Sequence, residues 1–407
     1  MITITVGVLG LAFHSGNLGC SALSYSFMYI LDEIAKNNDM KAEVRILSGA
    51  DDKRPLKAEF DRLSYSFVRL SWKNSAVRKK MLAAFDECDI IFDFTAGDSF
   101  TDIYGMSRFL KRSIYKKAVI KRKTPLVLGS QTYGPYKKAL SRRWAADIIK
   151  KSYEVFARDE KSAAVAEKLG KRKPILTTDI AFFLPYEKQQ ADDGVINIGI
   201  NVSGLLWNGG YTGNNQFGLT VDYPEYINRL LEKYSQDKKY KVHLIPHVVY
   251  KTSRDVADND WYICNDLAEK YSNVRIAPFF ESPMQAKSYI AGMDVFVGAR
   301  MHATVAAYSS GVAAIPFSYS RKFEGLYESL NYPYVISGTV LTTDEATQKT
   351  IGYIDDIEQL RKNISDYSST LGQKKEYMMR EYARLLTDLC HEECVNNEEK
   401  AQTDRGD

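Results

Sequence analysis

The chain has 407 residues, of which 45% are hydrophobic and 26% are charged, so it is long enough to form two globular domains with separate cores. Its formal net charge of +4 is small for this length and gives no indication of nucleic-acid binding. The five cysteines are odd in number and lack paired metal spacing, which favours reduced thiols. Because no basic leader begins the chain and no apolar run is long enough to span a membrane, we expect a cytoplasmic protein.

Apolar runs typical of buried parallel strands alternate with helical patterns in the first half of the chain. The first run, Ile2–Leu11, precedes a turn that contains Gly16, Asn17 and Gly19. These glycines allow a ligand to approach the backbone closely, although an ordinary strand-to-helix turn explains them equally well. The polar segment over 48–88 is expected to be helical. Further strands are expected at Val44–Leu47, Asp89–Phe94, Pro125–Gly129, Glu154–Ala157 and Ile175–Thr178.

Polar residues follow the carboxyl ends of these strands, where α/β sheets bind their ligands. Asp98 and Asp102 come after the third strand, and two carboxylates at such a position can activate a sugar hydroxyl or bind a metal ion. Alternatively, Asp98 or Ser99 only caps the helix that follows. The candidate substrate-binding residues of this half are Asn17, Gly97, Ser99, Asp102, Gln131 and Arg158.

Basic residues are scattered along the chain except in the run over Lys111–Lys123. The spacing of this run is typical of a solvated helix face, with Ile114, Ala118 and Val119 turned toward the core. A phosphate-rich partner or a membrane surface is the alternative interpretation of the same run.

The polar segment over 185–194 is expected to link two domains. After it, the strand Ile196–Asn201 leads into a long loop rich in Gly and Asn, which contains Trp207 and Tyr211. A loop of this length is more often functional or mobile than purely connective, and its two aromatic residues are compatible with stacking on sugar rings. Strands at Val242–Pro246 and Val274–Ala277 and helices at Tyr223–Tyr234, Trp261–Tyr271 and Pro283–Ala291 continue the alternation.

This alternation predicts an α/β protein with two Rossmann-like domains whose ligand sites face a central cleft. We predict an N-terminal domain over residues 1–185 and a C-terminal domain over residues 195–354. A helical pattern follows over 355–391, and the charged segment over 392–407 is typical of a disordered tail.

The segment from Asp294 to Gly325 concentrates residues with reactive or charged side chains. A short strand over Val295–Val297 runs directly into a helical pattern, so Arg300 and His302 fall on the turn between them. A helix N-terminus presents unpaired N–H groups and a partial positive charge, so an anion is the natural ligand of this turn. Alternatively, His302 only packs or caps the helix.

The next strand of this segment brings further polar residues to the same edge of the sheet. Tyr319, Arg321 and Lys322 follow it, which predicts three or four cationic groups around one histidine. Asn201 and His247 end the neighbouring strands and are further candidates for substrate binding.

Six segments share their order and spacing with a known family. The strongest is VGARMHATVAAYSSGVAAIPFSYSRKFEGL over 297–326, and the others are GNLGCSAL, TAGDSFTDIYG, LGSQTYGPY, FARDEKSAAVAEKLG and TTDIAFFLP. Together they resemble the polysaccharide pyruvyl transferase family, over a stretch from Val6 to Tyr334. Two departures concern the acceptor: Cys20 stands where the family usually carries Asp, and GSQTYGP replaces the usual Gly-Gln-Ser-x-Gly-Pro.

The resemblance implies a fold like that of the GT-B glycosyltransferases and the transfer of pyruvate from phosphoenolpyruvate to a sugar, which forms a cyclic ketal and releases phosphate. Arg300 and Lys322 would then neutralise the carboxylate and phosphate of phosphoenolpyruvate. His302 would protonate its methylene carbon or the leaving phosphate, and Asp98 would deprotonate an acceptor hydroxyl. The C-terminal domain would bind phosphoenolpyruvate, and the N-terminal domain would bind a free or lipid-linked sugar at the inner face of the membrane.

Two other functions remain open on the sequence. A glycosyltransferase with a nucleotide-sugar donor would use the same cationic residues for a diphosphate, and a non-catalytic sugar-binding or assembly protein could retain the fold. We expect no cofactor other than phosphoenolpyruvate as co-substrate. No metal-ligand cluster stands out, so the sequence leaves metal dependence undecided.

Overall fold

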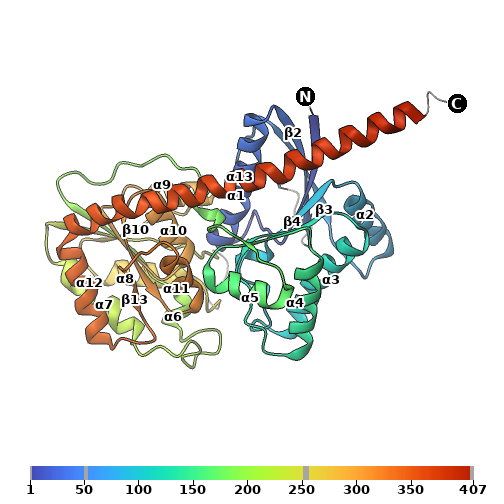
Figure 1. Cartoon of the computed structure of the whole chain (residues 1–407). Helices are drawn as coiled ribbons and strands as arrows, with labels where there is room; N and C mark the ends of the chain where they lie inside the picture. Colours follow the sequence, from blue (N-terminus) through green and yellow to red (C-terminus); the bar gives the residue numbers. More distant parts are fainter. Residues whose placement is uncertain (1, 50–53, 251–255, 404–407) are drawn as a thin grey trace. The chain divides into compact units, whose positions relative to one another are not determined.

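A computed structural model of the chain describes residues 2–49, 54–250 and 256–403, without the side chains of Arg321 and of residues 391–403. The chain forms two compact α/β units (Figure 1). Unit 1 consists of Met1–Ala12, Phe27–Asp179 and Gln373–Asp407, and unit 2 consists of Phe13–Ser26 and Ile180–Gly372. Both units are therefore discontinuous in the sequence, unlike the contiguous domains over 1–185 and 195–354 that the sequence predicts.

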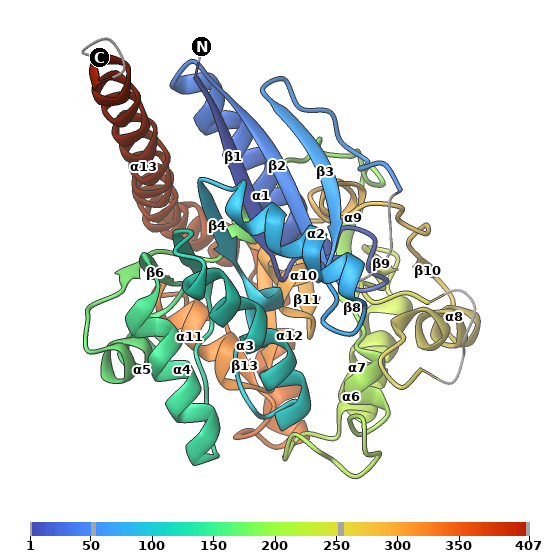
Figure 2. The same ribbon diagram turned by 90° about the vertical axis from the view of Figure 1, so that its right-hand side faces the viewer.

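Unit 1 is built on a seven-stranded parallel sheet. Its strands run side by side through the blue and green part of Figure 2. In the order of the sheet, they are β3 (Leu63–Arg69), β2 (Met40–Ser48), β1 (Ile2–Leu9), β4 (Ile90–Asp93), β5 (Leu126–Gln131), β6 (Glu154–Ala157) and β7 (Ile175–Leu176).

Helices cover both faces of this sheet, which explains why its central strands are continuous apolar runs. Ile91 of β4 belongs to a core cluster with Phe85, whereas the next residue, Phe92, packs against Phe27 and Tyr382 with ring centroids 5.0 and 5.5 Å away. The helices of this unit are α2 (Ser75–Asp86), α3 (Met106–Lys121), α4 (Ala139–Lys151), α5 (Glu160–Gly170), most of α1 (Leu18–Asn37) and the later part of α13 (Ile357–Thr403).

Unit 2 is built on a six-stranded parallel sheet. In the order of the sheet, its strands are β10 (Val274–Ile276), β9 (Tyr240–Leu244), β8 (Ile196–Asn201), β11 (Val295–Gly298), β12 (Ala313–Ser318) and β13 (Ile336–Ser337). Its helices are α6 (Gly204–Trp207), α7 (Tyr223–Ser235), α8 (Asp260–Lys270), α9 (Pro283–Ile290), α10 (Met301–Ser309), α11 (Arg321–Glu328) and α12 (Thr343–Asp355).

Both sheets have the strand order of the Rossmann fold. In this fold the order of the strands across the sheet reverses between the first and fourth strands of the unit. That reversal lies between β1 and β4 in unit 1 and between β8 and β11 in unit 2. Ligands of such sheets bind at the carboxyl ends of these two strands. The predicted pair of Rossmann-like domains is confirmed, and the reversal points fix where each unit is expected to bind a ligand.

The expected helical segment over 48–88 was wrong in part, because it contains the strand β3 before the helix α2. β3 lies at the edge of its sheet, and all seven of its residues are partly exposed or exposed. An edge strand of this kind lacks the apolar run that marks the central strands. At the other end of the chain, α13 continues to Thr403, where the sequence predicts a tail from residue 392.

The basic helix α3 buries Val119, as expected, but not Ile114. Ile114 is 39% exposed, whereas Lys116 is only 1% exposed. The Lys116 ammonium lies 3.1 Å from Asp93 and 4.7 Å from the centre of the Phe100 ring. Because this partner compensates the buried charge, the helix can turn a lysine inward that its sequence pattern assigns to solvent.

Candidate active site

The carboxyl ends of β8, β9 and β11 are tied together by one side chain of unit 2. Asn201 ends β8, and its Oδ1 accepts a hydrogen bond from the backbone N–H of Arg300 at 2.8 Å. Its Nδ2 donates to the carbonyl of Ile245, just after β9, also at 2.8 Å. Both polar atoms of this buried side chain therefore form hydrogen bonds to the backbone. Asn201 positions the turn after β11 and does not present an unbonded amide to a ligand.

Arg300 is the N-cap residue of α10, and its guanidinium is paired with two carboxylates. Nη2 lies 2.6 Å from Oδ1 of Asp260 and 2.9 Å from Oδ1 of Asp258, and Nε contacts both oxygens of Asp260. Burial lowers the pKa of Arg300, but the two carboxylates outweigh that effect and raise it above its ordinary value. The side chain is 9% exposed, and Nη1 makes no hydrogen bond to the described part of the chain.

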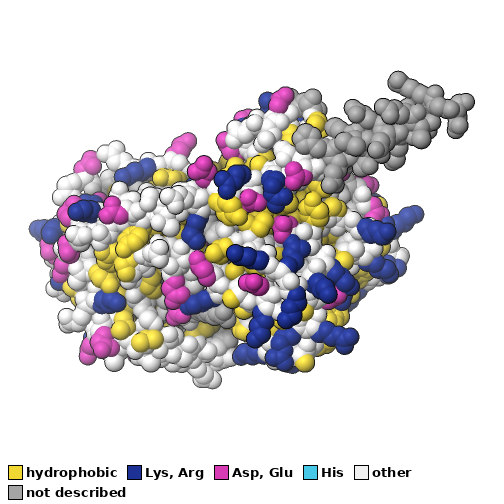
Figure 3. Space-filling model, viewed as in Figure 1, with side chains coloured by type: hydrophobic (Ala, Val, Ile, Leu, Met, Phe, Trp, Pro, Cys, Tyr) yellow, Lys and Arg dark blue, Asp and Glu magenta, His cyan; other side chains and the backbone are white. Residues whose placement is uncertain are grey.

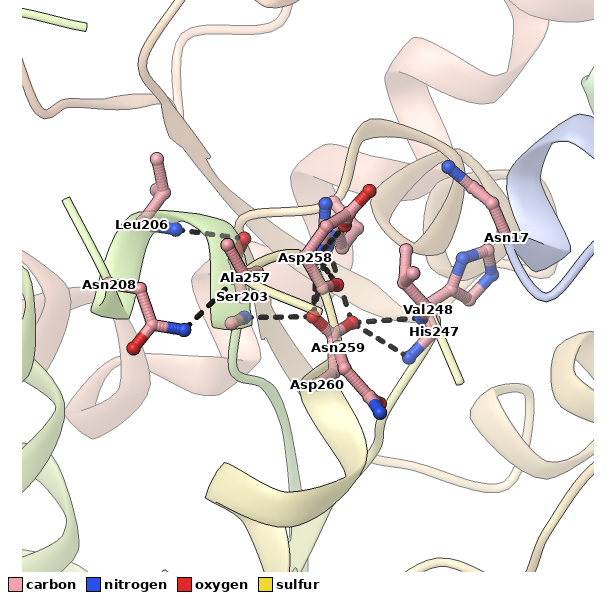
Figure 4. A network of polar contacts seen from close by, with 12 residues as sticks. Asn17, Ser203, Leu206, Asn208, His247, Val248, Ala257, Asp258, Asn259 and Asp260 are labelled. Carbon is pink, nitrogen blue, oxygen red and sulfur yellow. Dashed lines mark hydrogen bonds and ion pairs between the residues drawn. The ribbon is translucent and has the colours of Figure 1, made fainter. Parts of the chain in front are cut away.

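Asp260 is the centre of this network, although it is completely buried. Besides Arg300, its carboxylate accepts hydrogen bonds from the backbone N–H groups of Gly204, His247 and Val248 at 2.8, 3.0 and 2.9 Å. Figure 4 shows this carboxylate between the end of β9 and the start of α6. One side chain therefore joins the loops that follow β8 and β9 and holds the cation that follows β11.

The N-terminus of α1 lies against the catalytic candidate His302. Gly19 is the second residue of α1, and a Cβ atom at this position would lie 2.4 Å from Nδ1 of His302. His302 is in turn the second residue of α10. The imidazole is therefore packed between the first turns of two helices, both of which present a partial positive charge.

This contact depends on a segment that folds away from its sequence neighbours. Residues 13–26 belong to unit 2, where the N–H of Leu18 donates to the carbonyl of His247 at 3.0 Å and the N–H of Val249 donates to Gly16 at 2.8 Å. Asn17 accepts a hydrogen bond from the N–H of Gly19 at 3.0 Å and so caps α1. This turn was expected in the N-terminal domain, whereas these contacts join it to the β9 loop of unit 2.

His247 lies beside Asn17 at this junction, as Figure 4 shows. Its side chain is 3% exposed. Burial lowers the pKa of His247 to about 3, and the interactions with His302 and Arg300 act in the same direction. A neutral imidazole therefore stands next to the candidate catalytic histidine at neutral pH.

The remaining candidates of this edge follow β12. Lys322 is the second residue of α11 and is partly exposed, while the side chain of Arg321 lies outside the described part of the structure. Tyr319 is 8% exposed and packs against Phe217, with ring centroids 4.9 Å apart.

Three or four cationic groups were expected here from the sequence. The two carboxylates that pair with Arg300 were not expected. Asp258 and Asp260 flank Asn259, the N-cap residue of α8, about forty residues before Arg300. The acidic pair and the capping Asn259 between them were visible at the start of a predicted helix. Their pairing with Arg300 was not, because it depends on the tertiary structure.

In unit 1, Asp98 and its neighbours follow the reversal strand β4. Oδ2 of Asp98 accepts a hydrogen bond from the Tyr104 hydroxyl at 2.9 Å. Ser99 contacts Nη2 of Arg108 at 3.2 Å. Gly97 lies in the short helical turn η1 (Thr95–Gly97) just before them. These three candidates share one loop, and the partly exposed carboxylate of Asp98 lies among polar groups.

The other candidates of unit 1 hold its own backbone and side chains. Asp102 accepts hydrogen bonds from the N–H groups of Lys137 and Lys138 and from the hydroxyl of Ser141, at 2.9, 2.8 and 2.6 Å. Burial raises its pKa, but these hydrogen bonds outweigh that effect and lower it. Asp102 therefore acts as a cap for the start of α4.

Gln131 and Arg158 are both fully buried. Nε2 of Gln131 donates to the carbonyl of Asp93 at 2.9 Å, whereas its Oε1 has no hydrogen-bond partner within the described residues. Nη1 of Arg158 lies 2.7 Å from Asp179, whose carboxylate is equally buried. Of the two, only Gln131 presents an acceptor that the described chain leaves unused.

The family model of the polysaccharide pyruvyl transferases matches residues 17–321. The chain belongs to the polysaccharide pyruvyl transferase family. The match includes Asn17 and Arg300 with His302, so it spans both segments whose helix N-termini meet in unit 2, and it confirms the resemblance seen in the sequence. Membership of this family indicates a pyruvyl transferase enzyme. A search of curated protein sequences found no significant match.

Solved structures with the same fold include one epimerase and two synthases. UDP-GlcNAc 2-epimerase from Neisseria meningitidis, bound to UDP-GlcNAc, has a TM-score of 0.54 at 11% identity and covers 96% of this chain and 100% of its own. Sucrose-phosphate synthase from Thermosynechococcus elongatus has a TM-score of 0.58 at 9% identity, with coverages of 95% and 99%. The α,α-trehalose 6-phosphate synthase from Burkholderia multivorans has a TM-score of 0.53 at 8% identity, with coverages of 98% and 99%. At these identities the likeness shows the fold alone, which is the predicted GT-B type.

Within the described residues of this family member, no three or more His, Cys, Asp or Glu side chains are grouped so that they could hold a metal ion. Cys20, Cys88, Cys264 and Cys390 form no disulfide with one another. In the same part of the chain, no helix is both long enough and apolar enough to cross a bilayer.

Proposed function

We propose that this protein transfers pyruvate from phosphoenolpyruvate to two hydroxyl groups of one sugar in a surface polysaccharide or its precursor, as a cyclic ketal. The observation that carries the proposal is the packing of His302 between the first turns of α1 and α10, beside Arg300. Two helix N-termini favour a compact, highly charged anion. An imidazole at the same place supplies a proton donor for that anion.

The reaction requires two protons and two bonds to one carbon. The methylene carbon of phosphoenolpyruvate gains a proton and becomes a methyl group, while C2 forms bonds to both sugar oxygens and loses its bond to phosphate. Of the two hydroxyl protons released, one replaces the proton given to the methylene carbon and the other leaves with phosphate. His302 is proposed as the group that protonates the carbon or the phosphate and then accepts a proton back.

Arg300 is proposed to orient the anion rather than to neutralise it alone. Its charge is already matched by Asp258 and Asp260, and only Nη1 has no hydrogen bond to the described residues. Neutralisation of the carboxylate and phosphate is then assigned to the two helix N-termini and to Lys322. A rigidly held guanidinium keeps its direction during the reaction, which is what positioning requires.

Unit 1 is proposed to bind the acceptor sugar, with Asp98 as the base for an acceptor hydroxyl. Asp98 follows the reversal strand β4, and its carboxylate is partly exposed. Gln131 is proposed to contribute its unused acceptor, Oε1, to the same binding. No cofactor other than the co-substrate phosphoenolpyruvate enters the proposal.

We propose a cytoplasmic location with a peripheral position at the membrane, where a lipid-linked acceptor of an exopolysaccharide or cell-wall polymer would be met. Figure 3 shows Lys and Arg side chains gathered over α3 and α4, at the lower right of the view. Lys111 of α3 and Arg142 and Arg143 of α4 are exposed, and Leu140 of α4 is 48% exposed. Basic and apolar side chains together favour the surface of an anionic membrane.

The test is phosphate release from phosphoenolpyruvate by the purified protein, with free and lipid-linked sugars as acceptors. We expect acceptor-dependent release from the wild type and its loss in His302→Gln. Gly19→Ala should lower turnover about 100-fold, because its new Cβ displaces the imidazole. Gly352→Ala is the matched control, since a Cβ there meets no atom within 4 Å and should only stabilise α12, by about 1 kcal/mol.

Release that persists in His302→Gln would remove His302 from the mechanism. If the wild type releases no phosphate with any acceptor but is stabilised against heat by a nucleotide sugar and not by phosphoenolpyruvate, the protein uses a nucleotide-sugar donor instead.

A further inference from the structure

Unit 2 contains a cavity of about 590 Å³ that lies outside the Arg300 network. The segment from Leu206 to Pro224, after β8, forms its walls. Pockets of about 300 to 1,000 Å³ are typical of small-molecule sites. The cavity is therefore large enough for one or two sugar rings, and nothing in the proposed reaction uses it.

The lining of the cavity combines aromatic rings with neutral hydrogen-bonding groups. Trp207 and Phe217 supply partly exposed rings. The N–H groups of Gly209 and Gly210 and the hydroxyl of Thr220 donate within the chain, so the lining offers a ligand chiefly acceptors, which are the side-chain oxygen of Asn208 and the carbonyls of Gly209 and Gly210. Sugars bind well to such surfaces because the C–H face of the ring packs on an aromatic side chain while its hydroxyls form hydrogen bonds.

The charge of the lining separates this cavity from the Arg300 network. Among the described residues, its lining includes no Lys, Arg or His, and the one carboxylate there, Asp222, caps α7 by accepting the N–H of Glu225 at 3.0 Å. A phosphate or diphosphate would meet no cation there, so the lining fits an uncharged, hydroxyl-rich ligand.

The walls of the cavity also contact the residues around Arg300. Asn208 donates to the carbonyl of Ala257 at 3.1 Å, a contact drawn in Figure 4. The hydroxyl of Tyr211, in the same loop, lies 3.3 Å from Oδ2 of Asp258, whose other oxygen pairs with Arg300. A ligand in the cavity would therefore touch a loop that is attached to the side chains holding the catalytic arginine.

We propose that this cavity is a binding site for one neutral sugar ring of the saccharide substrate. Its assignment to the acceptor rests on the proposed function, whereas binding of the ring itself does not depend on phosphoenolpyruvate. Trp207 provides the stacking surface, and Asn208 and the glycine peptides bind hydroxyls.

The first experiment measures binding of the methyl glycosides of glucose, galactose, mannose and N-acetylglucosamine by ligand-observed NMR, with no phosphoenolpyruvate present. We expect at least one to bind the wild type and to bind Trp207→Ala about tenfold more weakly or not at all. Trp144→Ala, in unit 1, is the matched control and should bind as the wild type does. Melting temperatures of all three proteins establish that they are folded.

Three results would overturn the proposal. These are no glycoside binding by the wild type, equal binding by folded Trp207→Ala, or glycosides displaced by uridine diphosphate, which a cavity without cations should not bind. Trp207→Phe keeps a ring for stacking, so it should retain most of the binding that Trp207→Ala loses. Binding that is equally weak in Trp207→Phe and Trp207→Ala would also contradict the stacking role.

A second readout separates this proposal from the proposed function. In the phosphate-release assay, Trp207→Ala should raise the KM for an oligosaccharide acceptor about tenfold while leaving the KM for phosphoenolpyruvate unchanged. Glycoside binding that depends on Trp207 without any phosphate release would retain the sugar site and refute pyruvyl transfer. Phosphate release by Trp207→Ala with an unchanged acceptor KM would retain pyruvyl transfer and refute the sugar site.

Discussion

The carboxyl edges of the two sheets are held by different physical means. In unit 2, Asp260 gathers the start of α6, the end of β9 and the cation of Arg300 with one buried carboxylate. In unit 1, the candidate residues Asp102 and Arg158 make separate contacts, Asp102 at the start of α4 and Arg158 with Asp179. One edge is a shared charge network, and the other is a set of separate local contacts.

Backbone conformation takes the place of that network in unit 1. Thr95, Ala96 and Gly97 follow β4 with φ angles of 44°, 54° and 80°. Gly10 makes this possible, because a Cβ there would lie 2.5 Å from the backbone nitrogen of Thr95. Left-handed conformations of residues other than glycine cost about 1 to 3 kcal/mol each and persist only where the surroundings enforce them.

The two edges should therefore respond differently to the loss of one charged or polar side chain. Loss of one charge in unit 2 leaves another buried and uncompensated, so it should affect folding and the site together. Loss of one polar group in unit 1 should affect either stability or turnover, because few contacts are shared. Variants that remove a single carboxylate from each edge test this distinction.

The largest effect is expected from Asp260→Asn. It leaves the buried guanidinium of Arg300 with only Asp258 and weakens three backbone hydrogen bonds, so the free energy of unfolding should fall by about 3 to 5 kcal/mol. Urea unfolding followed by circular dichroism measures this loss. Asp258→Asn is the matched control, because Asp258 is 15% exposed and should cost about 1 kcal/mol. A smaller loss for Asp260→Asn than for Asp258→Asn would contradict the central role of Asp260.

A smaller and divided effect is expected in unit 1. Asp102→Ala removes three hydrogen bonds around the start of α4 and should lower the free energy of unfolding by about 2 kcal/mol, with kcat unchanged. Asp98→Ala should do the opposite, with stability within about 0.5 kcal/mol of the wild type and phosphate release lost. Urea unfolding and the phosphate assay are compared for both variants. If Asp102→Ala loses turnover at unchanged stability, Asp102 binds substrate as the sequence indicates.

The strands of both sheets could be predicted because their signal is local. The buried strands β1, β4 and β8 are apolar runs in the sequence, and the expected bounds of β6 and β8 agree with the structure. β3 was not predicted because an edge strand is partly exposed, so its sequence contains both polar and apolar residues. The division into units could not be predicted, because residues 13–26 follow β1 yet make their contacts with the β9 loop.

In the candidate site, too, local features could be predicted from the sequence and long-range contacts could not. Placing candidates at the ends of parallel strands brought Asn201, His247 and Arg300 to one edge, where the structure has them in one network. The partners that define their roles come from distant loops. Asp260 reaches Arg300 across 40 residues, and Gly19 reaches His302 across a longer stretch of sequence. No periodicity or motif in the sequence carries such contacts.

The smallest effect separates the units by their response to acid. The four histidines whose side chains are described, His14, His243, His247 and His302, all belong to unit 2. Burial lowers the pKa of His243 from 6.5 to about 4, with Arg275 and Lys241 also lowering it and Asp192 and Asp294 opposing, and burial lowers that of His247 to about 3. Below pH 6.5 these two imidazoles therefore bind protons in the unfolded chain but not in the folded one. The free energy of unfolding of unit 2 should fall as the pH falls.

Each of the two histidines should contribute at most about 1.4 kcal/mol per pH unit to this fall, from pH 6.5 down to its folded pKa. Replacing Trp72 and Trp144, which lie in unit 1, by Phe leaves Trp207 and Trp261 of unit 2 as the fluorescent reporters of urea unfolding. In that background, His243→Asn should flatten the dependence of unfolding free energy on pH between 6.5 and 4, whereas His14→Asn, at a partly exposed position, should leave it steep. Equal slopes in the two variants would show that the buried imidazole of His243 does not set the acid sensitivity of unit 2.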